Sequence, residues 1–216
     1  MKITVFSAKG SAGKTPISVN IALDRGYAVG TNETYHVLDA LIPEERLLAI
    51  TPNEEFPPLP DDIDIVFDLG GALGGDSAPS IRSAVMQSDV VFVPVYNEYK
   101  SINGAYHTIL EVQELTKNIA LICTKLEKRR NEIFRDWRDC QDFKDITSTL
   151  SGLVGQEYPA LPLKFSRGFD VIFAREMSLQ QLVDQGGLDA YTYRVVAEQF
   201  TAIYDFIDGV EHGKQK

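Results

Sequence analysis

The chain has 216 residues, a length typical of one domain and sufficient to bury a core without disulfide bonds or a structural metal. Hydrophobic residues make up 44% and charged residues 24%, which excludes wholesale disorder, a collagen-like repeat and a coiled coil. The formal net charge of −10 disfavours a protein that coats nucleic acid over its whole surface, although a local basic cluster is compatible with it.

Short apolar runs alternate with segments of helical spacing along the chain. Strands are predicted at 2–7, 27–31, 63–68, 90–95 and 119–124, and helices at 14–25, 78–87, 102–116, 128–150 and 189–208. The run 90–95 is apolar on both faces, as a parallel strand covered by helices on both sides requires. We therefore expect a single α/β domain over 1–216, built on a mostly parallel open sheet with helices on both faces, with an exposed proline-rich connector at 51–62.

The strongest motif is a glycine-rich loop between the first predicted strand and the first predicted helix. It reads Ala8-Lys9-Gly10-Ser11-Ala12-Gly13-Lys14-Thr15. Glycines let successive backbone N–H groups face inward, and the helix N-terminus adds its positive dipole end. A lysine at the loop's end can lie along the β- and γ-phosphates, and the threonine hydroxyl can ligate Mg²⁺. The loop is typical of a nucleoside triphosphate site; a glycine-rich turn without a ligand is the alternative.

Together with later motifs, this loop gives the chain a family resemblance. Lys9 to Thr15 resembles the deviant Walker A loop of the ParA/MinD partition and positioning ATPases, and Asp64 to Gly71 resembles their Walker B strand. The segments 88–95 and 121–125 are similar to the strands that follow. The resemblance implies a P-loop NTPase that binds ATP or ADP with Mg²⁺ and forms a homodimer on ATP binding.

The resemblance also implies roles for particular residues. The nucleotide-binding set would be Lys9, Gly10, Ser11, Ala12, Gly13, Lys14, Thr15 and Pro16. Lys9 would reach the partner's nucleotide and assist catalysis together with Lys14. Thr15 and Asp68 would hold Mg²⁺, the latter through water, although a strand-terminal aspartate that caps the following turn is the alternative for Asp68.

Several positions depart from the family pattern. Ser11 replaces a glycine, which is tolerable if its φ is negative, and Pro16 replaces a threonine at the first helical turn, where a missing N–H costs little. The usual Asp-x-Asp-Pro after the second strand is missing. Glu33 is the acid that either alignment retains, so it is the candidate for orienting the attacking water, with Asp39 as a weaker one. If neither acts, the protein is a nucleotide-binding switch with negligible hydrolysis.

Two groups of basic residues stand out in this acidic chain. The first runs from Lys125 to Arg138, and the second contains Lys164, Arg167 and Arg175. DNA-binding members of the family contact phosphates from these regions. Lys128, Arg129, Arg130 and Arg167 are therefore the candidates for non-specific DNA contact, with a solvated helix face as the simpler alternative.

Partners and location follow from the same comparison of motifs. The segment 165–168 resembles the region that borders adenine in relatives, and the C-terminal 211–216 lacks a basic amphipathic membrane helix. With no long apolar run, no signal peptide and only Cys123 and Cys140, we expect a cytoplasmic protein without membrane contact, associated with the nucleoid if it binds DNA. The function expected is partition of plasmid or chromosomal DNA with a ParB-like stimulating partner. The alternative is a related ATPase of conjugation or cargo positioning without DNA contact.

Overall fold

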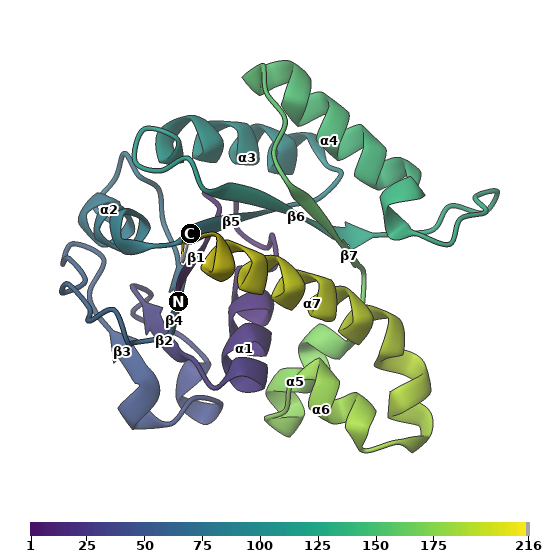
Figure 1. Cartoon of the computed structure of the whole chain (residues 1–216), viewed down its shortest axis with the longest axis horizontal. Coiled ribbons are helices and arrows are strands. Elements are labelled where there is room, and N and C mark those ends of the chain that lie inside the picture. The colour runs from purple at the N-terminus through teal and green to yellow at the C-terminus, as the bar shows by residue number, and fades with distance from the viewer. Residues whose placement is uncertain (215–216) are drawn as a thin grey trace.

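The computed structural model describes residues 1–214 and contains seven strands and seven α-helices among them (Figure 1). The strands are β1 Lys2–Phe6, β2 Ala28–Thr31, β3 Leu47–Ala49, β4 Ile65–Leu69, β5 Val90–Val95, β6 Ile119–Leu126 and β7 Ala160–Lys164. The helices are α1 Lys14–Arg25, α2 Ala78–Gln87, α3 Tyr99–Val112, α4 Gln141–Val154, α5 Gly168–Arg175, α6 Leu179–Asp184 and α7 Gly187–Lys214. No helix in the described part of the chain is both long and apolar enough to cross a membrane.

The strands form one sheet in the order β3-β2-β4-β1-β5-β6-β7. Every pairing between described strands is parallel, so the sheet is all-parallel and not just mostly so. The strand β1 lies in the middle, between β4 and β5. The glycine-rich loop that follows β1 therefore emerges at the centre of the carboxyl edge, where ligands of open α/β sheets bind.

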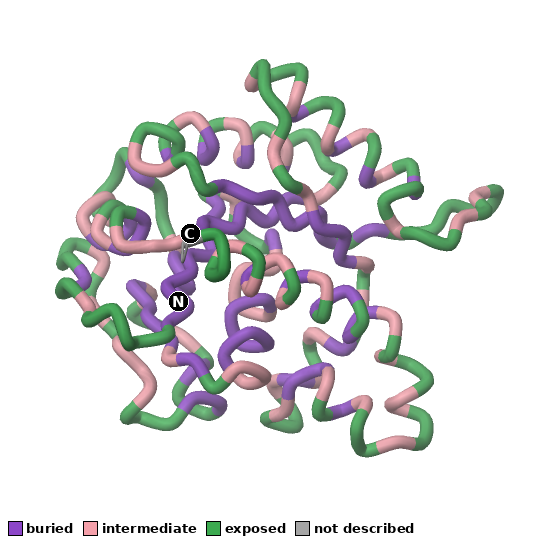
Figure 2. The backbone as a smooth tube through the Cα atoms, viewed as in Figure 1, coloured by how far each residue is buried: buried purple, intermediate pink, exposed green. Residues whose placement is uncertain are grey.

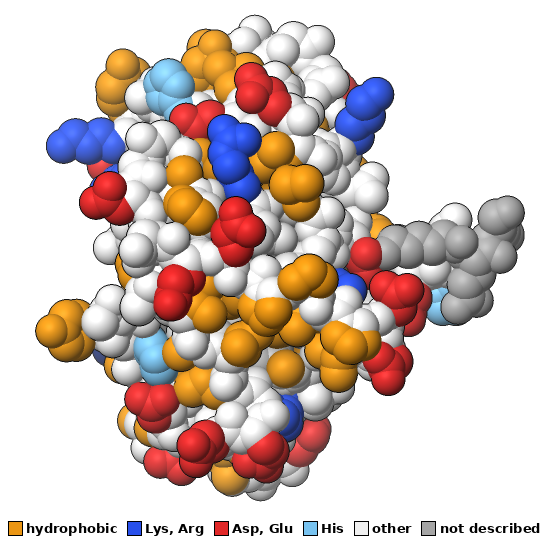
Figure 3. All heavy atoms as spheres, turned by 90° about the vertical axis from the view of Figure 1, so that its left-hand side faces the viewer, with side chains coloured by type: hydrophobic (Ala, Val, Ile, Leu, Met, Phe, Trp, Pro, Cys, Tyr) orange, Lys and Arg blue, Asp and Glu red, His pale blue; other side chains and the backbone are white. Residues whose placement is uncertain are grey.

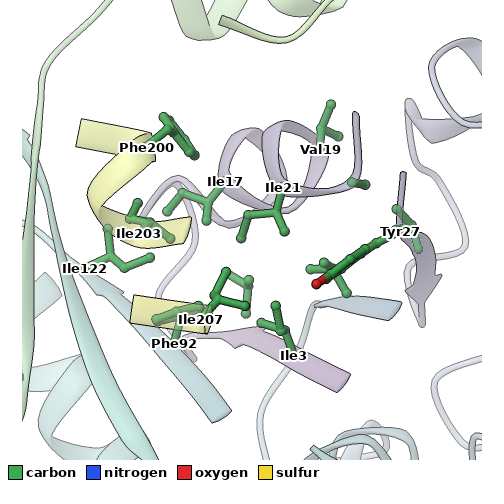
Figure 4. Close-up of a cluster of buried hydrophobic side chains, with 14 of the residues drawn as sticks. Ile3, Ile17, Val19, Ile21, Tyr27, Phe92, Ile122, Phe200, Ile203 and Ile207 are labelled. Carbon is green, nitrogen blue, oxygen red and sulfur yellow. The ribbon is translucent and has the colours of Figure 1, made fainter. Parts of the chain in front are cut away.

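Helices cover both faces of the sheet, as expected. Helices α1 and α7 lie on one face, and α2, α3 and α4 on the other (Figure 1). The buried segments run through the middle of the sheet and the inner sides of these helices (Figure 2). On the α1 side, Phe92 and Ile122 of the sheet meet Ile17 of α1 and Phe200 of α7 (Figure 4). This continuous apolar contact fixes α1, and hence the loop that precedes it, against the strands.

Several sequence-based boundaries differ from the structure. The segment predicted as a helix at 128–150 is wrong over its first part: residues 127–136 form a loop, a 3₁₀ helix follows at Trp137–Asp139, and α4 begins only at Gln141. Phe134 of this loop packs edge-on against Trp137 of the 3₁₀ helix, with ring centroids 5.2 Å apart. Helix α3 covers Tyr99–Val112 instead of 102–116. The strand predicted at 27–31 is observed as β2, Ala28–Thr31, and the strand predicted at 63–68 is observed as β4, Ile65–Leu69.

Four short elements have no counterpart among the ranges predicted from the sequence. They are the strands β3, which has only three residues, and β7, and the helices α5 and α6. The proline-rich segment 51–62 contains no helix or strand, but Phe56 within it is buried against Phe67 of β4 and its N–H donates to the Ser83 hydroxyl. At the C-terminus, α7 is longer than the predicted helix and reaches residue 214, so the tail expected over 211–216 is helical there, and residues 215–216 lie outside the described part.

On the side of the molecule that carries β3 and α2, carboxylates are spread around an apolar area (Figure 3). This distribution accords with the formal charge of −10. The basic segment after β6 lies elsewhere, in the extended loop between β6 and α4 that projects from the body (Figure 1). Its position makes it accessible to a partner but separates it from the centre of the sheet.

Candidate nucleotide site

The glycine-rich loop curls tightly between β1 and α1. Gly13, which caps α1, has φ 94°, and Ser11 has φ 62°, so both residues are left-handed. The condition under which serine would be tolerated at no cost, a negative φ, is therefore not met: the loop curls through a left-handed residue at this position, and serine adopts it at some cost in strain. Pro16 is the third residue of α1, where its missing N–H removes no hydrogen bond of the helix.

Residues of the neighbouring helix α3 and strand β6 hold the loop in place. The Ala8 N–H donates to Thr108 Oγ1 of α3 at 3.1 Å, and Thr124 Oγ1 at the end of β6 donates to the Ala12 carbonyl at 3.0 Å. Gly104 of α3 leaves room for Lys9, because a Cβ there would lie 3.0 Å from Lys9 Cβ. These supporting residues could not be predicted from the sequence, since single threonines and a glycine on distant elements carry no local signal.

The loop forms one wall of a pocket of about 400 Å³ at the carboxyl edge of the sheet. The residues that line it include Gly10 to Ile17, Glu33, Thr124, Lys125, Phe165, Ser166, Phe169 and Asp170. The loop after β2 and the loop after β7 thus converge on the glycine-rich loop, as expected for a nucleotide site. Lys9 does not line this pocket; its backbone lies against α3.

Asp68 lies on β4 beneath the loop. It is 3% exposed, and Ser18 of α1 donates to its Oδ1 at 3.2 Å. Burial raises the pKa of Asp68 to about 6, and the charge of Glu33 adds to this increase, while the Thr15 hydroxyl and Lys14 oppose it. The ionised carboxylate is thus poorly compensated by the protein alone, and a cation beside Thr15 would stabilise it.

Thr15 and Asp68 supply the side-chain oxygens that could act as ligands of Mg²⁺ in a Mg²⁺–triphosphate complex. A hydroxyl and a carboxylate are hard oxygen ligands, and Mg²⁺ in nucleotide sites commonly uses few protein ligands, phosphate oxygens and water. Among the residues that the structure describes, no group of three or more His, Cys, Asp or Glu is placed to hold a metal ion. The donor set therefore fits a metal that arrives with the nucleotide, not one bound by the protein alone.

Glu33 points toward Asp68 and the end of β4. A Cβ on Gly70 would lie 2.5 Å from Glu33 Oε1, so only glycine leaves space for this carboxylate. The preceding Asn32 is buried and joins β2 to β4: its Nδ2 donates to the Gly70 carbonyl at 3.0 Å, and its Oδ1 accepts from the Gly70 N–H at 2.8 Å. Asn32 is a positioning residue that sequence analysis missed. Asp39, the weaker candidate, is exposed beside His36 and does not line the pocket.

The basic segment after β6 does not join this pocket beyond Lys125. The Arg129 guanidinium donates to Asp142 at 2.6 Å and Asp145 at 3.3 Å, both on α4, and Lys128 lies over the ring of Phe134. Arg130 is exposed, as is Arg167, which precedes α5 and does not line the pocket. From 125 to 145 the chain has seven Lys or Arg and six Asp or Glu, so this region is nearly neutral.

Comparison with solved structures identifies the fold. Pyrococcus furiosus cell division ATPase MinD matches with a TM-score of 0.61 at 12% identity, covering 94% of this chain and 99% of that one. Cyanothece apo McdA matches with 0.59 at 13%, covering 92% and 98%. A putative plasmid partition protein from Borrelia burgdorferi, bound to AMPPNP, matches with 0.52 at 17%, covering 93% and 98%. No protein-family model and no curated protein sequence matches the chain. With its all-parallel sheet and central phosphate loop, the chain has the α/β P-loop fold of the ParA/MinD-type ATPases.

Proposed function

We propose that the chain is a Mg²⁺-dependent ATPase of the ParA/MinD type that uses ATP to close a homodimer. The observation that carries this proposal is that Lys14, Thr15 and Glu33 line one pocket, while the buried Asp68 lies next to Thr15 and within electrostatic reach of Glu33. The AMPPNP bound to the partition protein of the same fold supports an adenine nucleotide as the ligand.

Each residue has a role that follows from its position. The inward N–H groups of the loop and Lys14 bind the phosphates, and Thr15 with Asp68 orients the metal that accompanies them. Glu33 also lines the pocket, where it can orient a water and accept its proton. Phe165 and Phe169 supply an apolar wall for the base. When bound between Thr15 and the phosphates, Mg²⁺ would supply positive charge that offsets the negative charge developing as the γ-phosphoryl group passes to water.

The nucleotide proposal is tested by titrating the protein with Mg²⁺ and a non-hydrolysable ATP analogue in a calorimeter. We expect measurable binding for the natural sequence and a loss of about 100-fold or more for Lys14→Ala, because the charge-assisted contacts to phosphate are removed. Lys100→Ala, which removes an exposed lysine of α3, is the matched control and should bind normally. Absence of heat with the natural sequence, or normal binding by Lys14→Ala, contradicts the proposal.

Homodimer formation is supported by exposed aromatic side chains at the carboxyl edge of the sheet, where the pocket lies. Tyr35, Tyr99 and Phe165 are 94%, 83% and 49% exposed and follow β2, β5 and β7 at the same edge of the sheet. Exposed aromatic residues on one face are typical of an interface. A second copy seated on this edge would cover them and bring its Lys9 to the nucleotide.

Light scattering during gel filtration tests the dimer. With Mg²⁺ and the non-hydrolysable analogue, the natural protein should elute at twice the monomer mass. Lys9→Ala should still bind the analogue but stay monomeric, since its own pocket does not contain Lys9. Lys117→Ala, which removes an exposed lysine just before β6 at the opposite edge of the sheet, should dimerise normally. A Lys9→Ala protein that dimerises and hydrolyses ATP at the normal rate would remove the cross-subunit role.

The proposal also concerns the cargo that the ATPase moves, which is either DNA or a protein assembly. Exposed cations at Lys128, Arg130 and Arg167 favour non-specific contact with DNA, which suits partition of a plasmid or chromosome with a ParB-like partner. The near-neutral charge of 125–145 favours the second candidate, an ATPase that positions a protein cargo without DNA. Salt-dependent DNA titration, described in the Discussion, separates the two.

A further inference from the structure

The outer edge of β7 borders a second groove, of about 480 Å³, that shares no residue with the nucleotide pocket. Its walls are the 3₁₀ helix Trp137–Asp139 on one side and the middle of α7 on the other. Pro162 of β7 and Ala202 of α7 contribute apolar surface. The groove therefore lies beside the last strand of the sheet, the position at which a further strand could be added.

Gln199 of α7 lines this groove and carries an unpartnered donor. The residue is 8% exposed, and its Oε1 accepts from the Lys164 N–H at 3.0 Å. Because a backbone N–H can only donate, the side-chain atom that faces it must be the oxygen, and the amide nitrogen must point elsewhere. That Nε2 is buried and has no hydrogen-bond partner. A buried amide N–H without an acceptor is costly, so the groove favours a ligand that supplies one.

The backbone of β7 offers the complementary group. Leu121 of β6 donates to the Pro159 carbonyl and Phe165 donates to Leu126, so the odd-numbered positions face β6. The Lys164 N–H instead faces Gln199, which places the even-numbered positions on the outer side. The Pro162 carbonyl therefore points away from β6, and proline at this position removes no sheet hydrogen bond. Together, Gln199 and Pro162 present one donor and one acceptor to the groove.

The charges around the groove limit the chemistry of its ligand. Arg135 lines it and forms no ion pair among the described residues. The two carboxylates on the wall are both paired, Asp136 with Arg138 at 3.1 Å and Glu198 with Arg194 at 3.7 Å. Arg135 is therefore the one unpaired charge among the described residues of the wall, which suits a ligand with a single acid better than the dense charge of a nucleic-acid backbone.

We propose that this groove binds an extended segment of a partner protein that carries an Asp or Glu side chain. The segment adds to the edge of β7: one of its carbonyls accepts from Gln199 Nε2, and one of its N–H groups donates to the Pro162 carbonyl. Its acid pairs with Arg135. This site goes beyond the proposed nucleotide function and does not depend on it.

A selection from a phage-displayed library of random dodecapeptides on the full chain tests the proposal. The enriched sequences are synthesised with a fluorescent label and titrated by anisotropy. Gln199→Glu is the sharpest variant, because it retains the oxygen that accepts from Lys164 but replaces the donating NH₂ with an acceptor. Arg135→Glu changes the groove's cation at the surface, where folding is little affected, and Arg130→Glu makes the same change outside the groove.

We expect the enriched peptides to combine Asp or Glu with β-branched residues and to lose at least tenfold in affinity for Gln199→Glu and for Arg135→Glu. Arg130→Glu should bind within twofold of the natural protein. The proposal is overturned if no acidic peptide is enriched, if both groove variants bind normally, or if a 20-base-pair duplex binds through Arg135 in place of peptides. Titration of the same variants with the ATP analogue should be unchanged, so failure at the groove leaves the nucleotide proposal intact.

Discussion

The loop after β1 and the segment after β6 both show clustered cations in the sequence, but the fold uses them differently. Lys9 and Lys14 form no salt bridge with a carboxylate among the described residues, and Lys14 lies in the pocket. In the segment after β6, Arg129 is held by Asp142 and Asp145 of α4. The positive charge of the loop after β1 is therefore available to a ligand, whereas part of the positive charge after β6 is neutralised by ion pairs within the molecule.

The difference shows which functional features can be recognised from consecutive residues alone and which depend on the rest of the fold. A phosphate loop binds through its own backbone N–H groups and the helix that follows, so a few consecutive residues define it. The potential of a basic cluster depends on every carboxylate that folds against it. Here the helix that supplies those carboxylates begins at Gln141, well after the cations. The following changes test whether this contrast is correct.

The largest effect is expected at the pocket. Glu33→Gln should lower the rate of ATP hydrolysis about 100-fold, because the amide cannot accept the proton of the attacking water. Affinity for the ATP analogue should change little, since the role concerns water and not phosphate. Asp39→Asn is the control, an exposed acid outside the pocket, and should hydrolyse normally. Phosphate release in single-turnover experiments is the measurement; equal rates for both variants would leave Glu33 as a surface acid.

A smaller effect is expected in the basic segment. If the protein binds duplex DNA, replacing Lys128 and Arg130 together by alanine should weaken binding several-fold and flatten the slope of log K against log[salt] by about 2, one for each lost phosphate contact. Arg129→Ala should leave the slope unchanged, because its guanidinium is already paired. Anisotropy titrations across a salt series give these slopes. Failure of the natural protein to bind DNA at low salt would select the cargo-positioning function.

The smallest effects are expected on the melting temperature, and they should have opposite signs at two carboxylates, Asp68 and Asp142. The folded pKa of Asp68, about 6, lies above its ordinary 3.8, so the stability of the fold declines as the pH rises from about 4 to 6, and the full loss of about 2–3 kcal/mol is present above pH 6. Asp68→Asn should therefore raise the melting temperature of the nucleotide-free protein by several degrees at pH 7.5, with no gain near pH 4. Its affinity for Mg²⁺ and the ATP analogue should fall.

Asp142 should respond in the opposite direction. Burial alone would raise its pKa, but hydrogen bonds from Asn97 and Arg129 outweigh burial and lower the pKa below 3.8. Its ionised form therefore stabilises the fold above about pH 4, and this contribution is lost as the pH falls. Asp142→Asn should lower the melting temperature at pH 7.5 by about 1–3 °C. Scanning calorimetry measures both melting temperatures. A change of the same sign for Asp68→Asn and Asp142→Asn at pH 7.5 would contradict the opposite pKa shifts of the two carboxylates.

Much of the fold could be predicted from the sequence because its signals are local. The apolar run 90–95 predicted β5 and its parallel environment, and the spacing of 14–25 and 78–87 predicted α1 and α2 with their observed bounds. The helix expected at 128–150 failed over its first part, since the polar character of 128–140 suits a helix face and an exposed loop equally well. The three-residue β3 is too short to show periodicity.

For the site, the sequence by itself determined the phosphate loop, and it singled out Glu33 and Asp68 as candidates. Only the tertiary structure decided that these acids lie near each other, that Asn32 joins β2 to Gly70, and that Thr124 supports the loop from β6. It also decided that Arg129 is paired and that Gln199 has an unpartnered donor beside β7. The physical reason is range: backbone curvature and helix dipoles are set by consecutive residues, whereas burial, pairing and pKa depend on side chains that the fold brings together from distant positions.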